Sequence, residues 1–339
     1  MIQVIDAHAL LAQPERPIEW AIDGLAPTGA VMDVFGPPGA GKTTLLTDFA
    51  MAWAAEAGQW HGRAIQGGPA VILGGERTDR GALQRDLRRT HRPSPEAGAL
   101  TLPVDKAGDC PPIWAWDRRA LDGAGAWRLT PWGAEVTDWL GGAQPKMVII
   151  DTVISAAAGC DLLDQPQQYM LGLEIRQWAK RIGATLTVTV SHTNQASAGQ
   201  DFKARLDYLS RAGGNGFPGA LRQTAGLTKL MTGLDAALAA ACGLDKSDES
   251  LFLFGFSKHN ETPRPDWTNH APAIFTQRTG QVEMVMSGEA VRLALRAVEA
   301  LGPDQAKPKA KPKSQKQNEY ARAKDGQSAA MAGGDDDWE

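Results

Sequence analysis

The chain carries a Gly-rich stretch whose spacing suits the binding of a phosphate chain. Residues 36–43 read GPPGAGKT and match the pattern G-x-x-x-x-G-K-[ST]. In such a loop backbone N–H groups point at phosphate oxygens, the lysine neutralises the β- and γ-phosphates of ATP, and the threonine hydroxyl binds Mg²⁺. We therefore predict a site for ATP and Mg²⁺, with an ordinary strand–helix turn as the alternative. Its predicted contacts are Gly36, Pro37, Pro38, Gly39, Ala40, Gly41, Lys42, Thr43 and Thr44.

Two carboxylates are candidates for the chemistry around the γ-phosphate. Asp151 ends the apolar run MVII and is predicted to hold Mg²⁺ through water, unless it only caps the next turn. Thr152 rather than Glu follows it, which argues against ATPase classes whose acid and base are adjacent. Glu76, which follows two glycines at a strand end, is therefore the predicted catalytic base. The alternative for Glu76 is a surface ion pair with the Arg-rich segment behind it.

A histidine ends the fourth apolar run of the chain, in TVTVSHTNQ. His192 is predicted to contact the γ-phosphate and to report its loss to the loop that follows. The alternative is an ordinary hydrogen-bonded residue at a strand end.

The elements that position these residues alternate along the chain. Short apolar runs predict strands, and apolar residues at helical spacing predict helices between them. This order indicates an α/β fold whose mainly parallel central sheet is flanked by helices on both faces. Residues 93–130 are Pro/Gly/Trp-rich and are expected to be irregular. The expected strands are 30–36, 69–76, 146–151, 184–192, 220–231 and 250–260, with a hairpin in 272–285; the expected helices are 43–58, 77–92, 131–142, 166–183 and 289–301.

Composition and charge limit the class of protein. A net charge of −4 provides no global basic field, so any nucleic acid must be bound by local basic loops. The three cysteines lack CxxC spacing, and no apolar run is long enough to cross a membrane, so a cytoplasmic protein is expected. We expect an N-terminal lead-in with a possible inter-subunit arm at 1–30, an ATPase domain at 31–301, and a disordered Lys/Pro-rich tail at 302–339.

The order of these features resembles one known family. In chain order these features are a phosphate loop, a strand-end Glu, an apolar run with Asp, a strand ending in His and a late GFSKHN at 255–260. This order is similar to that of the RepA-type hexameric replicative helicases, which are RecA-fold AAA-family ATPases of plasmids and phages. The resemblance implies a RecA-like P-loop NTPase in a ring of subunits, with Lys258 reaching the neighbour's ATP. The family's arginine finger would fall at Gly226, and Arg222, four residues earlier, is the candidate substitute.

The same resemblance places single-stranded DNA at the loop 199–219, which lines the central pore in such rings. The loop carries cations that could contact phosphates and aromatic rings that could stack on bases. The alternative is a loop that binds no nucleic acid. The predicted cations are Lys203, Arg205 and Arg211, and the predicted aromatic residues are Phe202, Tyr208 and Phe217.

The function implied by the resemblance is a ring-shaped DNA helicase driven by ATP hydrolysis. A first alternative is a single-strand-dependent ATPase that remodels or loads recombination or repair complexes without unwinding, and a second is an ATP-gated binding module. A small-molecule kinase would need an acceptor pocket and an Arg-rich lid, for which the helix at 80–92 is the candidate. The acidic tip 333–339, which ends in DDDWE, is expected to dock a replication or repair partner.

Overall fold

The computed structural model describes most of the chain up to residue 300. Glu76, Tyr208 and the tail at 302–339 lie outside the described residues, so the predictions made for them stay predictions. The described residues are 6–15, 17–74, 84, 87–88, 100–161, 163–194, 200–207, 211, 215–230, 234–245, 250–259, 272–278 and 281–300.

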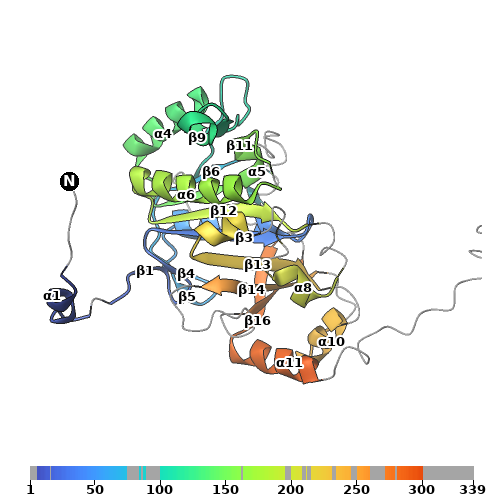
Figure 1. Cartoon of the computed structure of the whole chain (residues 1–339). Helices are drawn as coiled ribbons and strands as arrows, with labels where there is room; N and C mark the ends of the chain where they lie inside the picture. The colour runs from blue at the N-terminus through green and yellow to red at the C-terminus, as the bar shows by residue number, and fades with distance from the viewer. Residues whose placement is uncertain are drawn as a thin grey trace, which may run out of the picture.

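A nine-stranded sheet forms the centre of the molecule (Figure 1). Its strand order is β16-β15-β14-β13-β3-β12-β10-β6-β7. The strands from β13 to β7 pair in parallel, whereas β14, β15 and β16 continue the sheet in antiparallel pairs. The bounds are β3 Ala30–Gly36, β6 Ala70–Leu73, β7 Leu100–Thr101, β10 Met147–Ile150, β12 Leu186–His192, β13 Gln223–Lys229, β14 Leu251–His259, β15 Ala273–Arg278 and β16 Gln281–Ser287. The predicted α/β fold with a mainly parallel sheet is confirmed.

The first strand of the sheet in chain order, β3, lies in its middle. The late strands β12 and β13 pair with β3 on either side, and β10 and β6 follow beyond β12. Both faces of these strands are buried, as expected for parallel strands that are covered on both sides. The carboxyl ends of the parallel strands therefore meet at one edge, where α/β proteins bind their ligands.

Helices cover both faces of the sheet. On one face α2 packs against β3 through Leu45, Leu46 and Phe49, which share a core cluster with Met32 and Val34. On the other face α4 and α6 form a second cluster with the strands, built around Trp114 and Trp178 (Figure 1). A third cluster joins α8, α10 and α11 to the outer strands. The bounds are α2 Lys42–Ala54, α4 Pro131–Ala143, α6 Gln165–Ile182, α8 Phe202–Leu206, α9 Gly216–Ala220, α10 Leu234–Ala241 and α11 Glu289–Ala300.

The region predicted to be irregular contains a small sheet of its own. β8 (Trp114–Asp117) pairs antiparallel with β9 (Ala126–Leu129) and parallel with β11 (Ala157–Ala158), which follows α5 (Val153–Ala156). The prediction of an irregular region was wrong here for two reasons. β8 and β9 are only four residues each, and their tryptophans pack on α6 without the alternation of apolar and polar residues that indicates a strand.

The N-terminal residues lie outside the main sheet. α1 (Ala7–Leu11) buries none of its residues and lies away from the sheet (Figure 1). β1 (Trp20–Ile22) and β2 (Ala26–Pro27) pair with each other, as do β4 (Gln59–Trp60) and β5 (Arg63–Ala64). In the described part of the chain, the search for a helix with the length and hydropathy of a membrane span finds none.

Candidate nucleotide site

The phosphate loop connects β3 to α2 at the carboxyl edge of the sheet. β3 ends at Gly36, and α2 begins at Lys42 after Gly41, whose φ of 75° is left-handed. A Cβ at Gly36 would lie 2.0 Å from the carbonyl oxygen of Leu227, so only glycine lets β3 and β13 approach here. Thr43 and Thr44 are half-buried in the first turn of α2. The strand, loop and helix that the predicted phosphate site requires are therefore all present.

Lys42 is held inside this loop. Its side chain is 5% exposed, and Nζ donates hydrogen bonds to the carbonyls of Gly36 at 2.8 Å and Pro37 at 2.9 Å. Nζ also lies 3.4 Å from Nδ1 of His192, which is opposite Gly36 in the parallel pair β12–β3. The structure thus brings His192 to the phosphate loop, beside the group predicted to bind the γ-phosphate.

Asp151 lies at the same edge, directly after β10. Its side chain is 4% exposed, and its backbone N–H donates to the carbonyl of Leu73 at 2.7 Å. That bond sets the end of β10 beside the end of β6, the strand that leads to Glu76. Thr152 is the N-cap of α5 in a capping box with Ser155, and the Asp151–Thr152 peptide bond is cis. The residue that caps α5 is therefore Thr152, whose side chain accepts a hydrogen bond from the backbone N–H of Ser155.

The residues at this edge fit a magnesium ion. Mg²⁺ prefers oxygen ligands and is usually held by one or two carboxylates together with substrate phosphates. Asp151 follows β10 and Thr43 lies in the first turn of α2 after β3, and both side chains offer oxygen atoms at this edge of the sheet. When bound, the ion would neutralise phosphate charge. In the ranges the structure describes, there is no group of three or more His, Cys, Asp or Glu that could hold a metal by itself.

A β-bulge in β14 decides on which face of the sheet Lys258 lies. β14 pairs Phe256 with Ala225 but Lys258 with Thr224, which leaves Ser257 as an extra residue. The bulge breaks the alternation that would put Lys258 on the α2 face with Phe254, and instead directs it to the face covered by α6. There Nζ donates to the carbonyl of Pro218 at 2.8 Å.

Arg222 also lies far from its own chain's phosphate loop. It is exposed and precedes Gln223, which pairs with Met32 near the start of β3. The strand partner of Phe35 is Gly226, so Arg222 is about 13 Å back along β13 at about 3.3 Å per residue. The structure therefore does not bring Lys258 and Arg222 to Lys42 within one chain.

Comparison with known protein families identifies the family of the chain. A family model described as an AAA domain matches residues 2–198, which include the phosphate loop, Asp151 and His192. The chain belongs to this AAA-domain family. A solved structure that is similar to it is a KaiC-like protein from the hyperthermophilic archaeon Pyrococcus horikoshii, with 15% identity and a TM-score of 0.48 over 80% of this chain and 100% of that one. No curated protein matches the sequence. The family and the sheet make the chain a RecA-like P-loop ATPase.

One buried acid of this AAA domain was missed by the sequence analysis. Asp33, in the middle of β3, is 0% exposed and accepts hydrogen bonds from the hydroxyls of Thr189 and Ser191, both at 2.8 Å. Its other oxygen lies 3.0 Å from Nε of Arg211. The only signal was a single charge inside an apolar strand, which requires a buried partner.

Arg211 is consequently part of the interior and not of a DNA-binding surface. It is 1% exposed, its Nη1 lies 3.4 Å from Oε1 of Gln168 on α6, and its guanidinium stacks 4.3 Å from the ring centroid of Phe217. Phe217 is itself 0% exposed and so cannot stack on a base. The predicted roles of both residues in nucleic-acid binding are corrected to structural ones, because their contacts are inside the protein.

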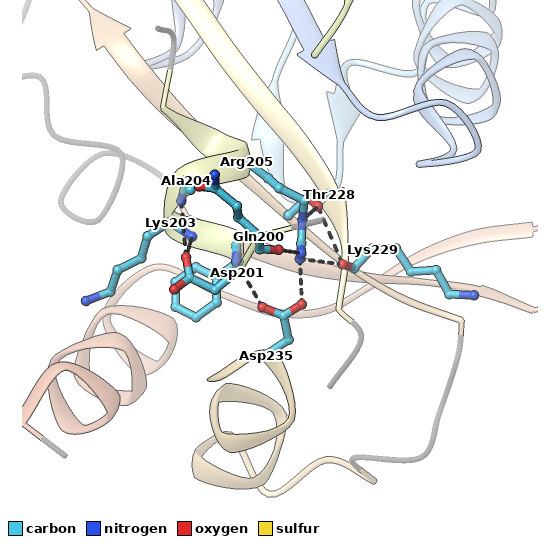
Figure 2. A network of polar contacts seen from close by, with 9 residues as sticks. Gln200, Asp201, Lys203, Ala204, Arg205, Thr228, Lys229 and Asp235 are labelled. Atoms are coloured by element: carbon cyan, nitrogen blue, oxygen red, sulfur yellow. Dashed lines mark hydrogen bonds and ion pairs between the residues drawn. The ribbon is translucent and has the colours of Figure 1, made fainter. Parts of the chain in front are cut away.

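Arg205 is the centre of a second buried network (Figure 2). Its Nη2 lies 2.5 Å from Asp235 of α10, its Nε donates to Thr228 at 2.5 Å, and the Gln200 carbonyl accepts from Nη1. The side chain is 1% exposed, so its predicted contact with DNA is also corrected to a structural role. Phe202, at 0% exposure, is excluded from base stacking in the same way.

Among the three predicted cations, Lys203 is the least buried. It is half-buried on α8, and Figure 2 shows its side chain pointing away from the Arg205 network. Its backbone N–H donates to Asp201, the N-cap of α8. Each of the two buried arginines ties the loop to a strand of the sheet, Arg205 to β13 and Arg211 to β3.

Proposed function

We propose that the chain is a ring-forming ATP hydrolase whose nucleotide is bound between neighbouring copies and whose hydrolysis moves single-stranded DNA, as in a replicative-type helicase. The observation that carries this is the separation of Lys42 from Lys258 and Arg222. The phosphate loop lies at the carboxyl edge of the sheet, whereas Lys258 and Arg222 both lie toward the start of β13. This placement supports a role for the two cations at a nucleotide held by another copy.

The contacts of Lys42 and His192 support their proposed roles, and the roles of Glu76 and Lys258 are those expected from the sequence. Lys42 binds the β- and γ-phosphates, and its bonds to Gly36 and Pro37 are exchanged for bonds to phosphate oxygens. His192 lies beside Lys42 and transmits the loss of the γ-phosphate, as a change of contact, to the segment after β12. Glu76 accepts a proton from the attacking water, and Lys258 supplies positive charge from the neighbouring copy.

A second candidate is a single-strand-dependent ATPase that remodels a recombination or repair complex without unwinding. The burial of Arg205 and Arg211 favours this second candidate, because fewer cations then remain to hold single-stranded DNA while a duplex is opened. One experiment separates the candidates: the ATPase rate is measured with and without single-stranded DNA, and strand displacement is measured on a forked duplex. Stimulation with displacement supports the helicase, and stimulation alone supports the remodelling ATPase.

The Lys42→Ala variant is the control for both measurements. It removes the ammonium from the phosphate loop and is expected to abolish hydrolysis and displacement together. If neither single-stranded DNA nor the forked duplex changes the ATPase rate of the wild type, both DNA-dependent functions are rejected. An ATP-gated binding module then explains the protein better.

The acidic tip at 333–339 is proposed to dock a replication or repair protein through its aspartates and Trp338. A chain ending at residue 332 should lose one partner from a pull-down while keeping its ATPase rate. An unchanged set of partners would reject this role.

A further inference from the structure

Two cations from different elements hold the short helix α9. Nζ of Lys258 donates to the carbonyl of Pro218 at 2.8 Å, and Nη1 of Arg176 on α6 donates to the carbonyl of Ala220 at 3.0 Å. Lys258 is half-buried and Arg176 is exposed, so each reaches the surface. Their carbonyl partners are two residues apart, which places the two positive charges side by side.

Among the residues that the structure describes, no carboxylate compensates these two charges. Burial, and after it the charge of Arg176, lowers the pKa of Lys258 below its ordinary value. Within the described ranges, neither Lys258 nor Arg176 is ion-paired to a carboxylate. Backbone carbonyls offset positive charge less well than an anion does, so the pair is suited to bind a phosphate.

A groove opens beside Arg176 at the edge opposite the phosphate loop. Its volume is about 670 Å³, and its walls come from α6 and from the residues before β3 and β12. Among the described residues that line it, Arg176 and Lys180 are charged and both are basic. A polyphosphate could therefore reach the Arg176 guanidinium without meeting a lining carboxylate.

The position where a finger was expected cannot hold an arginine. A Cβ at Gly226 would lie 2.5 Å from Cδ2 of Leu206 and 3.1 Å from the ring of Phe35. A long side chain there would displace the core between β3 and α8. The missing guanidinium must therefore come from another element if the shared site has one.

We propose that Arg176 is the second trans-acting cation, which with Lys258 binds the phosphates of ATP held by the phosphate loop of a neighbouring copy. This rests on the shared nucleotide site proposed above. Arg176 supplies the planar fork that matches two phosphate oxygens, and Lys258 supplies a point charge. Binding exchanges the Pro218 and Ala220 carbonyls for phosphate oxygens. It thereby frees α9, which forms the end of the loop 199–219 predicted to contact DNA.

Complementation between variants tests the proposal. Arg176→Gln should lower kcat by roughly 10²–10³-fold, somewhat less than a complete arginine finger because Lys258 remains. Its own phosphate loop is intact, so ATP should still bind. Mixing it with Lys42→Ala should restore hydrolysis well above the sum of the separate rates, because Lys42→Ala copies donate Arg176 to their neighbours. A parallel mixture of Lys258→Met with Lys42→Ala tests the shared site itself.

The outcomes separate the two proposals. A gain with Lys258→Met but none with Arg176→Gln would overturn the role of Arg176 and leave the shared site intact. No gain in either mixture would overturn the shared site. Arg181→Gln, one turn away on α6 and paired with Glu174, is the matched control and should keep the wild-type rate. If Arg176→Gln melts at a lower temperature, Arg176→Lys, which keeps the charge, replaces it in the same mixtures.

Discussion

Nζ of Lys42 lies 3.4 Å from Nδ1 of His192, although the two residues are 150 positions apart in the chain. The contact exists because β12 pairs directly with β3, so that His192 stands opposite Gly36. It joins the lysine predicted to bind phosphate to the end of β12, the strand that precedes the loop predicted to contact DNA.

Replacing this histidine should slow turnover more than it weakens binding. A hydrogen bond to a charged group contributes about 1.5–3 kcal/mol, so His192→Ala is expected to lower kcat by about 10–100-fold. The Kd for ATP should change less, because Lys42 and the phosphate loop around it remain in the variant. Steady-state ATPase kinetics and a fluorescent-nucleotide titration measure the two effects. His8→Ala, on the exposed α1, is the control. A larger change in Kd than in kcat would contradict the assignment.

The two predicted acids should respond differently to loss of charge. Glu76→Gln is expected to bind Mg·ATP normally and to lose about 10²–10⁴-fold in kcat, because a general base contributes that much. Asp151→Asn should instead require more Mg²⁺ for half-maximal rate. Magnesium titrations of the ATPase rate for both variants make the comparison. An unaffected rate for Glu76→Gln would refute the base.

The buried pair of Asp33 and Arg211 should be essential for stability. Asp33→Asn leaves the guanidinium buried without its counter-charge, which is expected to cost about 3–5 kcal/mol in the free energy of unfolding. Chemical denaturation measures this. Glu174→Gln, which breaks the exposed pair with Arg181, is the control and should cost less than about 1 kcal/mol. If both variants lose the same free energy of unfolding, the buried pair stabilises the fold no more than the pair of Arg181 with Glu174 does.

Lys203 and Arg205 should have separable effects on DNA binding. Lys203→Ala is expected to keep the wild-type melting temperature while weakening single-strand binding and reducing its salt dependence by about one charge. Arg205→Ala should instead lower the melting temperature, because Asp235 loses its buried partner. Binding isotherms at several salt concentrations, with thermal melts, distinguish them. Intact salt dependence in Lys203→Ala would remove that residue from the DNA surface.

The ATPase should lose activity at high pH through Lys258. Burial and the neighbouring charge of Arg176 lower the pKa of Lys258 from 10.5. Since the cationic form is the one that binds phosphate, the rate should fall as pH rises through this lowered pKa. Lys258→Arg keeps its charge and should move the fall to higher pH. A rate–pH profile of each enzyme tests this, with Lys106→Arg as the exposed control. Superimposable profiles for wild type and Lys258→Arg would exclude Lys258.

The sequence by itself determined the phosphate loop, the strand that ends at Asp151 and the α/β class. These features depend on residues close together in the chain: the glycine spacing of 36–41, the apolar runs, and the helical periodicity after Lys42. The strand ending in His192 belongs with them, since β12 ends where the apolar run does.

Only the tertiary structure decided which charged residues are free to bind a ligand. Arg211 and Asp33 are 178 positions apart, and Arg205 and Asp235 meet only because α10 folds against α8. The Ser257 bulge that redirects Lys258 likewise depends on the pairing of β13 with β14. A basic residue has the same local pattern whether it faces solvent or a buried carboxylate. Burial is a property of the packed sheet and not of the neighbouring sequence.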